Sequence, residues 1–333
     1  MVGAVRPSAR VVLLSEVNSK FGSPFFGDLI GHPNIEVVGL VTQPEGQLCA
    51  YYVGEPDPVD LSEQAARAEV PVLRPANVND ERVLAALRRL DPDYLVIANF
   101  QQILRQPILD LPRQAAVNFH PSPLPRYAGL APFFWMALNA EREGGVSAII
   151  TTPGIDEGPV LASRRVRLTG RETAGEIRDS HFIESRRLLH HVIPRLVARD
   201  MHATPQDLAH RTYFSRPGDE DVRVRWSWST ERIMRVIRAC CPEPGALAVT
   251  ECGVIRVHQA RPWRSAIPAT APGRMAMDSG EGLVISCGDG WLQLVRISWP
   301  SETAREDVAQ AAPSTPSWAS LRELAQARRG ARG

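Results

Sequence analysis

The sequence of 333 residues has few lysines, few cysteines and no surplus of charge of one sign. Lys20 is the only lysine among 38 basic residues, so covalent catalysis through a lysine amine is disfavoured. The five cysteines, at positions 49, 240, 241, 252 and 287, contain no CxxC pair and leave an odd thiol. We therefore expect neither a disulfide framework nor a metal site, and a reducing cytoplasm fits best.

Charge and hydropathy disfavour two further classes of protein, those that attract polyanions without sequence preference and those that associate with membranes. The 38 basic residues stand against 37 acidic ones, for a formal net charge of +1, which gives no electrostatic footprint for polyanions or for anionic membrane surfaces. The N-terminal apolar run at 11–14 is four residues long, too short for a signal peptide and far too short to cross a bilayer. We expect a cytoplasmic protein without membrane contact, and the sequence leaves its oligomeric state open.

The first half of the chain contains short apolar runs that alternate with longer mixed segments. This alternation predicts an α/β fold with an open, mostly parallel, Rossmann-like sheet. The expected strands are residues 10–14, 35–41, 94–98, 115–119 and 146–151, and the expected helices are residues 61–69 and 80–90, the second with Asn79 or Asp80 as N-cap. In such a sheet, ligands bind beyond the carboxyl ends of the strands.

The second half has a different pattern. Residues 172–200 form a long amphipathic segment that Pro194 is expected to kink or split. The expected strands are residues 222–228, 247–250, 254–259, 282–287 and 291–298, with hairpin turns at Gly253 and 288–290 and an inserted helix at 230–240. These short strands predict a small, C-terminal, β-barrel-like domain.

The chain is accordingly divided into four parts. The predicted boundaries are 1–201 for a catalytic domain, 202–212 for a linker, 213–312 for the C-terminal domain and 313–333 for a tail with a short helix at 321–328. The tail is expected to be peripheral.

The densest cluster of chemically unusual residues follows the strand expected at 115–119. Asn118 and His120 are two positions apart, so in an extended chain their side chains leave the same face. Prolines at positions 121, 123 and 125 then impose a stiff, irregular loop that cannot continue a central strand. Asp156 stands between glycines, after the strand expected at 146–151. Neighbouring strand ends can bring this amide, imidazole and carboxylate together.

These three groups suit acyl transfer to an external nucleophile. An amide donates to an oxyanion, an imidazole exchanges protons near neutral pH, and a carboxylate orients the imidazole and stabilises its cation. Ser122 lies between prolines, outside a Gly-x-Ser-x-Gly setting, so direct transfer without a covalent intermediate is favoured. Taken singly, each residue also has an ordinary structural explanation: a turn asparagine, a surface or core histidine, and a common GxDxG loop.

Both motifs resemble those of the folate-dependent formyltransferases, the family of methionyl-tRNA formyltransferase. They read N-x-H-P-S-x-L-P-x-Y-x-G-x-x-P at 118–132 and G-I-D-E-G-P at 154–159. The resemblance extends from about residue 10 to 310 and includes residues 38–44, 92–98, 102–104, 109–112, 225–229, 233–239 and 288–294. It implies a Rossmann-like formyltransferase domain followed by a barrel-like C-terminal domain.

The resemblance also implies a reaction in which 10-formyltetrahydrofolate donates a formyl group to an amine. It makes Asn118 a donor to the developing oxyanion, His120 the group that steadies this oxyanion and relays a proton, and Asp156 the group that holds His120 and accepts the amine proton. The folate is expected to lie over Ser122, Pro123, Leu124 and Pro125, with its pterin against Gln102, Ile103 and Leu104. No metal is implied.

The sequence departs from the tRNA enzymes in features that concern the acceptor. Those enzymes have a basic loop after the second strand, whereas residues 45–61 here contain no Lys or Arg and four acids, which repel a nucleic acid. Ala128 stands where they commonly have Arg, and from residue 205 onwards 17 arginines stand against 14 acids. We therefore expect the acceptor to be a small-molecule amine or hydroxylamine, such as a biosynthetic intermediate, an amino sugar or a modified amino acid.

Three other functions stay open. Formylation of methionyl-tRNA is disfavoured by the acidic loop but is compatible with the second domain. A formyltetrahydrofolate deformylase, in which water replaces the amine, needs the same three polar groups. A folate-binding protein without activity is disfavoured because all three groups are present. A nicotinamide-dependent enzyme is disfavoured as well, since the turn at 15–22 has one glycine where a dinucleotide fingerprint needs several.

Overall fold

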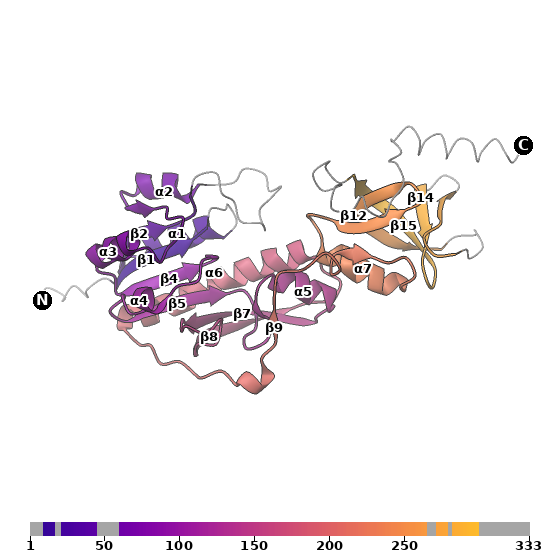
Figure 1. The fold of residues 1–333 in the computed structure, drawn as a ribbon. Coiled ribbons are helices and arrows are strands. Elements are labelled where there is room, and N and C mark those ends of the chain that lie inside the picture. Colours follow the sequence, from indigo (N-terminus) through magenta and orange to yellow (C-terminus); the bar gives the residue numbers. More distant parts are fainter. Residues whose placement is uncertain (1–8, 17–20, 45–59, 265–270, 279–281, 300–333) are drawn as a thin grey trace, which may run out of the picture. The chain divides into compact units, whose positions relative to one another are not determined.

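The computed structural model describes residues 9–16, 21–44, 60–264, 271–278 and 282–299 (Figure 1). The chain forms two compact units. Unit 1 consists of Met1–Pro132, Glu143–Arg167 and Arg178–Ser215, and unit 2 of Phe133–Arg142, Leu168–Ile177 and Arg216–Gly333. The chain therefore passes between the units several times.

Unit 1 is built on a seven-stranded sheet with strand order β3-β2-β1-β4-β5-β7-β8 (Figure 1). The strands are β1 (Ala9–Ser15), β2 (Ile35–Val41), β3 (Val72–Leu73), β4 (Tyr94–Ala98), β5 (Ala115–His120), β7 (Glu143–Ile150) and β8 (Val160–Arg167). The first five in this order pair in parallel, whereas β7 is antiparallel to β5 and to β8. The predicted α/β class with an open, mostly parallel sheet is confirmed.

Most residues of β1, β2, β4 and β5 are buried, which explains why these strands are visible in the sequence. Every residue of β4 is buried, and β2 and β4 have the predicted bounds. A strand covered on both faces reads as a continuous apolar run. Side chains of α3 (Glu81–Leu90) and α4 (Gln106–Leu109) pack with residues of these strands in one core cluster, which contains Val12, Leu14, Val41, Leu84, Leu87, Leu95, Ile97 and Ile108.

Two of the helices of unit 1 begin where the sequence predicts. Helix α2 (Leu61–Arg67) starts after Asp60, whose carboxylate accepts a hydrogen bond from the backbone N–H of Ser62 at 2.8 Å, a typical N-cap contact. Helix α3 has Asp80 as its N-cap, as expected, although the Asp80 side chain makes no capping hydrogen bond. Helix α1 (Gly22–Ile30) was not predicted, because its Gly and Pro residues hide the helical pattern.

Helix α6 (Ala174–Ala198) contains Pro194, where the sequence predicts a kink or a split. The helix is not split and runs through Pro194 to Ala198. Pro194 and His190, whose carbonyl loses its helical partner, are both exposed, so water can satisfy that carbonyl. The opposite face is buried through Val192, Ile193 and Leu196, and its packing holds the last turn in place.

Unit 2 contains a curled six-stranded sheet with strand order β10-β11-β12-β15-β14-β13. Its strands are β10 (Arg223–Val224), β11 (Ala246–Thr250), β12 (Gly253–Trp263), β13 (Met275–Asp278), β14 (Gly282–Ser286) and β15 (Trp291–Ser298). All neighbours pair antiparallel except β10 and β11. Gly253, with φ of +103°, forms the predicted hairpin between β11 and β12, a backbone conformation that favours glycine. The barrel-like C-terminal fold is confirmed.

Helix α7 (Thr230–Ala239) lies where the sequence predicts a helix, but the strand expected at 222–228 is wrong beyond Val224. The backbone N–H of Trp228 bonds to the carbonyl of Arg225, and the indole N–H of Trp226 bonds to the carbonyl of Val249. A turn therefore replaces the strand. Helix α5 (Pro132–Leu138) is the last α-helix to be named in the described ranges. The helix expected at 321–328 lies outside these ranges.

None of the helices in the described ranges is long and apolar enough to cross a membrane.

Candidate active site

His120 ends strand β5 and faces Asp156. The Nδ1 atom of His120 lies 3.5 Å from Oδ1 of Asp156, and the two side chains are 9 % and 11 % exposed. The pair is thus largely withdrawn from water, which strengthens the interaction between an imidazolium and a carboxylate. The other ring nitrogen, Nε2, lies 3.2 Å from the carbonyl oxygen of Tyr127. A carbonyl oxygen only accepts, so this contact is a hydrogen bond when the ring carries a proton on Nε2, while Nδ1 faces the carboxylate.

Asp156 reaches His120 through a loop that returns along the sheet. Strands β5 and β7 are neighbours, as expected, but they are antiparallel, so Ile150 at the end of β7 pairs with Val117. The chain between β7 and β8, residues 151–159, turns back and brings Asp156 to the histidine. The two groups therefore meet because this loop returns, and not because two strand ends coincide.

The Asp156 carboxylate is held in place by the loop that follows β5. Its Oδ2 accepts a hydrogen bond from the backbone N–H of Gly129 at 2.8 Å. Gly129 has φ of +95°, and a Cβ atom there would lie 2.3 Å from the carbonyl oxygen of Phe214, so only glycine fits. One carboxylate oxygen thus faces the imidazole and the other is bonded to the backbone.

Asn118, the third predicted catalytic residue, lies two positions before His120 on β5. The alternation of side chains along a strand places both on the same face. Asn118 is partly buried, and its register partners are Ile97 on β4 and Ile149 on β7. The amide is therefore a polar group set among apolar neighbours, close to the end of the strand.

The seven residues predicted to bind folate lie on two loops that leave the same edge of the sheet. Residues 102–104 follow β4 and residues 122–125 follow β5, and the two strands are parallel neighbours. Ile103 is 68 % exposed, whereas Leu104 is part of the buried core. Gln102 supports the loop through its side chain, which accepts a hydrogen bond from the N–H of Val78 and donates one to the carbonyl of Pro75.

The second of these loops is internally bonded. Ser122 is fully buried, and its hydroxyl donates to the carbonyl oxygen of Arg126 at 3.0 Å. Its own carbonyl accepts from the hydroxyl of Ser147 at 2.9 Å, and the peptide bond between Leu124 and Pro125 is cis. The Ser122 side chain therefore shapes the loop, while Pro123, Leu124 and Pro125 retain partly exposed surface.

A buried carboxylate at the end of β1 was missed at the sequence level. Glu16 is fully buried, and its Oε1 accepts hydrogen bonds from the side chain of Gln43 at 2.7 Å and from the N–H of Gln101 at 3.1 Å. It thereby joins the segment after β2 to the loop that leads to residues 102–104. The available signal was a charged residue directly after an apolar strand, which we interpreted only as the end of that apolar run.

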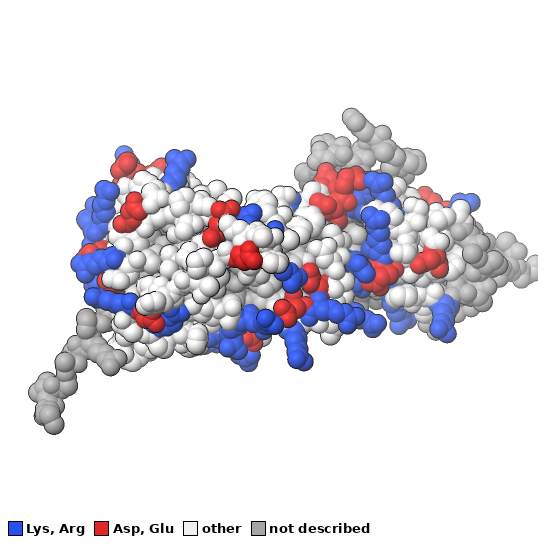
Figure 2. All heavy atoms as spheres, turned by 90° about the horizontal axis from the view of Figure 1, so that it is seen from below, with Lys and Arg blue, Asp and Glu red and all other residues white. Residues whose placement is uncertain are grey.

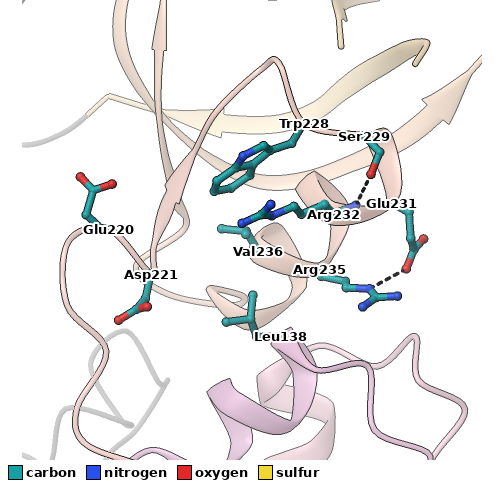
Figure 3. A pocket seen from close by; sticks show the side chains of 9 residues that line it. All are labelled: Leu138, Glu220, Asp221, Trp228, Ser229, Glu231, Arg232, Arg235 and Val236. Carbon is teal, nitrogen blue, oxygen red and sulfur yellow. Dashed lines mark hydrogen bonds and ion pairs between the residues drawn. The ribbon is translucent and has the colours of Figure 1, made fainter. Parts of the chain in front are cut away.

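Two hollows in the described residues are lined by other side chains. One, of about 250 Å³ in unit 1, is lined by Phe21, Pro24, Phe25, Asp179, Phe182, Ile183 and Arg186. The other, of about 420 Å³ in unit 2, is shown in Figure 3. In that hollow the Arg232 guanidinium lies 3.9 Å from the centre of the Trp228 ring, and Glu231 is bonded to Arg235. Neither hollow is lined by Asn118, His120 or Asp156.

Comparison with known proteins gives matches over most of the chain. Residues 9–193 match the family "Formyl transferase" and residues 218–307 match "Formyl transferase, C-terminal domain". The chain is 33 % identical over 261 residues to the methionyl-tRNA formyltransferase of Acidithiobacillus ferrooxidans, a match that covers 78 % of this chain and 82 % of that protein.

Solved structures show the same fold at low sequence identity. The N-formyltransferase from Helicobacter canadensis, in complex with folinic acid and dTDP-3-aminofucose, is 16 % identical with a TM-score of 0.60, over 86 % of this chain and 97 % of that one. HypX from Aquifex aeolicus, in complex with tetrahydrofolic acid, is 16 % identical with a TM-score of 0.59 over 92 % of this chain. This chain spans about half the length of HypX, 49 %. The matches to both family domains, together with the close relatives, show that the chain belongs to the formyl transferase family.

Proposed function

We propose that the protein transfers the formyl group of 10-formyltetrahydrofolate to the amine or hydroxylamine of a small molecule. The observation that carries this proposal is the shielded contact of His120 with Asp156 at 3.5 Å, with Asn118 on the same face of β5. These residues supply a proton acceptor, a proton relay and a neutral amide donor at one strand end, and direct formyl transfer needs all three.

In the proposed reaction, the amine nitrogen bonds to the formyl carbon while the bond from that carbon to N10 breaks. Negative charge develops on the formyl oxygen, and the Asn118 amide and the His120 imidazole stabilise it. The amine loses one proton and N10 gains one, so the step needs no further reactant. Asp156 takes the proton from the amine, and His120 relays a proton onward.

To stabilise the formyl oxygen of the substrate, His120 must give up one of the two contacts that its ring nitrogens make in this structure. The contact of Nδ1 with the Asp156 carboxylate is charge-assisted when the ring is protonated, whereas Nε2 bonds to a neutral carbonyl of Tyr127. An ion pair between side chains that are largely withdrawn from water is the stronger of these two interactions. The bond to Tyr127 is therefore the one that gives way when substrate binds.

The exposed parts of two loops fit the folate co-substrate. Ile103 presents an apolar side chain to solvent, and residues 123–125 form a stiff, partly exposed surface, which suits a planar pterin and its linker. Two solved members of the same fold hold tetrahydrofolic acid or folinic acid. We assign Gln102, Leu104 and Ser122 to the support of these loops, because their side chains are bonded internally or buried.

The choice of a small acceptor is supported by charge. The acidic stretch at 45–59 lies outside the described residues, and Asp60, which follows it, is bonded to Arg74. Among the described residues visible in Figure 2, basic and acidic side chains are interspersed within each unit. The position where the tRNA enzymes commonly have Arg is Ala128 in this chain, and this alanine is fully buried. It therefore supplies no positive charge for a nucleic acid. One structural neighbour was solved with an amino sugar nucleotide.

Methionyl-tRNA formylation is the second candidate. It is favoured by the name of the relative that is 33 % identical and by the match of residues 218–307 to the family's C-terminal domain. The two candidates share the donor and the chemistry, and they differ in the acceptor alone.

A panel of acceptors separates the candidates. The full chain is incubated with 10-formyltetrahydrofolate and, in separate reactions, modified ornithines, free and nucleotide-linked amino sugars, charged initiator tRNA, or no acceptor. Folate release and product mass are followed. We expect release and a product heavier by one formyl group with one class of small amine.

Each other outcome contradicts the proposal in its own way. Turnover with charged tRNA alone, reduced by added salt, identifies the second candidate. Release of formate without an acceptor identifies a deformylase. No folate turnover under any condition, with folate still bound, identifies a binding protein.

A further inference from the structure

We propose that residues 204–214 act as a strap that sets the position of Asp156 relative to His120, with Gln206 as its main positioning residue. This inference rests on the proposed function for its kinetic readout only. The sequence suggested that residues 202–212 form a linker, but the strap is bonded along its length to the two loops that carry the candidate site.

One end of the strap is bonded to the loop that contains Asp156. Thr204 and Val160 exchange both backbone hydrogen bonds, at 2.7 and 2.9 Å. The side-chain amide of Gln206 donates to the carbonyl oxygens of Asp156 at 2.8 Å and Gly158 at 2.7 Å. Gln206 thus holds two peptide groups of the Asp156 loop with one nitrogen.

Arg211 adds a third attachment to the Asp156 loop. Its Nη2 donates to the carbonyl oxygen of Ile155 at 2.9 Å and lies 3.5 Å from the carboxylate of Glu157. The residues on both sides of Asp156 are therefore attached to the strap.

The other end of the strap is bonded to the loop that follows His120. The N–H of Tyr127 donates to the hydroxyl of Thr212 at 2.8 Å, and β9 (Tyr213–Phe214) pairs in parallel with β6 (Ala128–Gly129). The Tyr127 and Phe214 rings stack with their centres 5.0 Å apart. Tyr127 and Gly129 are the residues whose backbone groups bond to His120 and Asp156, so the strap holds both partners of the pair.

The backbone of Asp156 explains why its loop needs this support. Asp156 has φ of +56°, a left-handed conformation that only a few per cent of residues other than glycine adopt. A change of this residue to an ordinary conformation would rotate its carboxylate away from His120. The bond from Gln206 to the Asp156 carbonyl opposes that rotation, since it fixes the orientation of the peptide group directly after the carboxylate-bearing residue.

The burial of the Gln206 amide is consistent with this role. Its Oε1 atom is buried and has no hydrogen-bond partner among the described residues. Such an unpaired acceptor is unfavourable, so the side chain is retained in this position by its two donated bonds. A glutamine in a linker without contacts to the site would not be held in this orientation.

The test compares Gln206→Leu with the wild type and with Asp207→Asn, all as full chains. Asp207 is the neighbouring residue, its side chain is 67 % exposed, and among the described residues it bonds to Ala209 and His210 alone, both within the strap. For Gln206→Leu we expect kcat to fall about 10- to 100-fold, because a small displacement of a catalytic group is sufficient for that loss. The KM for 10-formyltetrahydrofolate should stay within about twofold, since the folate loops are untouched.

A second measurement does not depend on activity. The Gly129 amide, which donates to the Asp156 carboxylate, should exchange its hydrogen at least about tenfold faster in Gln206→Leu, because exchange follows local opening. The Asp207→Asn control should leave both kcat and this exchange unchanged. If Gln206→Leu does not fold, Gln206→Glu keeps the shape of the side chain. The ratio of its kcat to the wild-type kcat at the same pH should rise as pH falls, because a protonated carboxyl donates one hydrogen bond to the loop whereas a carboxylate donates none.

The outcomes separate the strap from the proposed function. The positioning role is overturned if Gln206→Leu has the kcat of the wild type. It is also overturned if kcat falls only in proportion to the fraction of protein that is folded while the exchange of the Gly129 amide is unchanged. If the wild type turns over no folate but Gly129 exchange still rises in Gln206→Leu, the strap stands and the proposed function fails.

Discussion

At the residue scale, the two oxygens of Asp156 perform different tasks. Oδ1 faces the imidazole of His120 at 3.5 Å, and Oδ2 accepts the N–H of Gly129 at 2.8 Å. An asparagine in this position keeps the left-handed backbone, which Asn and Asp tolerate better than most residues, and its amide oxygen still accepts from Gly129. The substitution therefore removes only the negative charge of Asp156 and its ability to accept a proton.

We therefore predict that Asp156→Asn folds normally and lowers kcat about 100-fold or more, the range typical of a lost general base. The KM for 10-formyltetrahydrofolate should change less than about threefold, because the loops assigned to folate are intact. Steady-state kinetics and a thermal melt test both points. The matched control is Asp110→Asn, an exposed carboxylate bonded to Gln106. A loss of folate affinity in Asp156→Asn equal to its loss of kcat would assign Asp156 to binding.

His120→Ala should lower kcat at least as much as Asp156→Asn does. In the proposed reaction the imidazole lies between the Asp156 carboxylate and the reacting formyl oxygen. The double variant His120→Ala with Asp156→Asn should then be little worse than either single variant, because residues that act as one unit are not additive. Kinetics of all three variants test this. Additive losses would show that the two residues act independently.

The sequence identifies the candidate reactive groups but not the residues that hold them. Asn118, His120 and Asp156 stand out because of unusual neighbours, namely prolines and glycines at strand ends. Gln206 bonds to a residue 50 positions away, and Glu16 bonds to the backbone of a residue 85 positions away. Contacts between residues so far apart leave no local pattern in the sequence. The support of the site therefore depends on tertiary contacts that a single sequence does not reveal.

At the scale of secondary-structure elements, local sequence patterns predict the strands that are buried on both faces and the helices whose N-cap residue directly precedes an amphipathic stretch. Strands β2 and β4 were predicted with their observed bounds, and α3 and α7 to within one residue at each end. The edge strand β8 was not predicted, because its residues Ser163, Arg164 and Arg165 are exposed and carry no apolar pattern. The turn after Val224 was missed because it is fixed by bonds to β11 and to the 287–290 turn.

Helix α2 gives a test at this scale, because its N-cap is a titrating group. Burial raises the pKa of Asp60, but hydrogen bonds from Arg74 and from the Ser62 amide outweigh burial and hold the pKa below its ordinary value of 3.8. A lowered pKa in the folded state means that ionised Asp60 stabilises the fold above the unfolded-state pKa. That contribution is lost as pH falls through the folded-state pKa.

Asp60→Asn should therefore lower the free energy of unfolding by about 0.5 to 1 kcal/mol at neutral pH, the range of a partly exposed ion pair. The difference from the wild type should shrink below pH 3.8 and vanish once Asp60 is protonated. Calorimetric melts at a series of pH values test this, with Glu63→Gln as a control on the same helix, since Glu63 is 72 % exposed and lies 3.9 Å from Arg67. A difference that stays constant down to pH 2 would show that the charge of Asp60 is not responsible.

At the scale of the whole molecule, the two units are not two consecutive stretches of chain. Phe133–Arg142 and Leu168–Ile177 belong to unit 2, although they lie before the boundary predicted at 201. Within unit 2, the N–H of Gly175 bonds to the carbonyl of Cys241 at 3.0 Å, and Leu138 lines the hollow with Trp228. Segments that are far apart in the sequence therefore build unit 2 together.

A fragment of residues 213–333 should for this reason be less stable than unit 2 in the full chain. It loses both segments and with them the contacts of Gly175 and Leu138. Since about 1 kcal/mol shifts the midpoint of a 100-residue domain by several degrees, we expect its melting temperature to fall by more than about 5 °C. Tryptophan fluorescence is a selective readout, because all seven tryptophans of the chain lie in the ranges of unit 2. A fragment that melts at the same temperature as the fluorescence transition of the full chain would mean that the two early segments add no stability to unit 2.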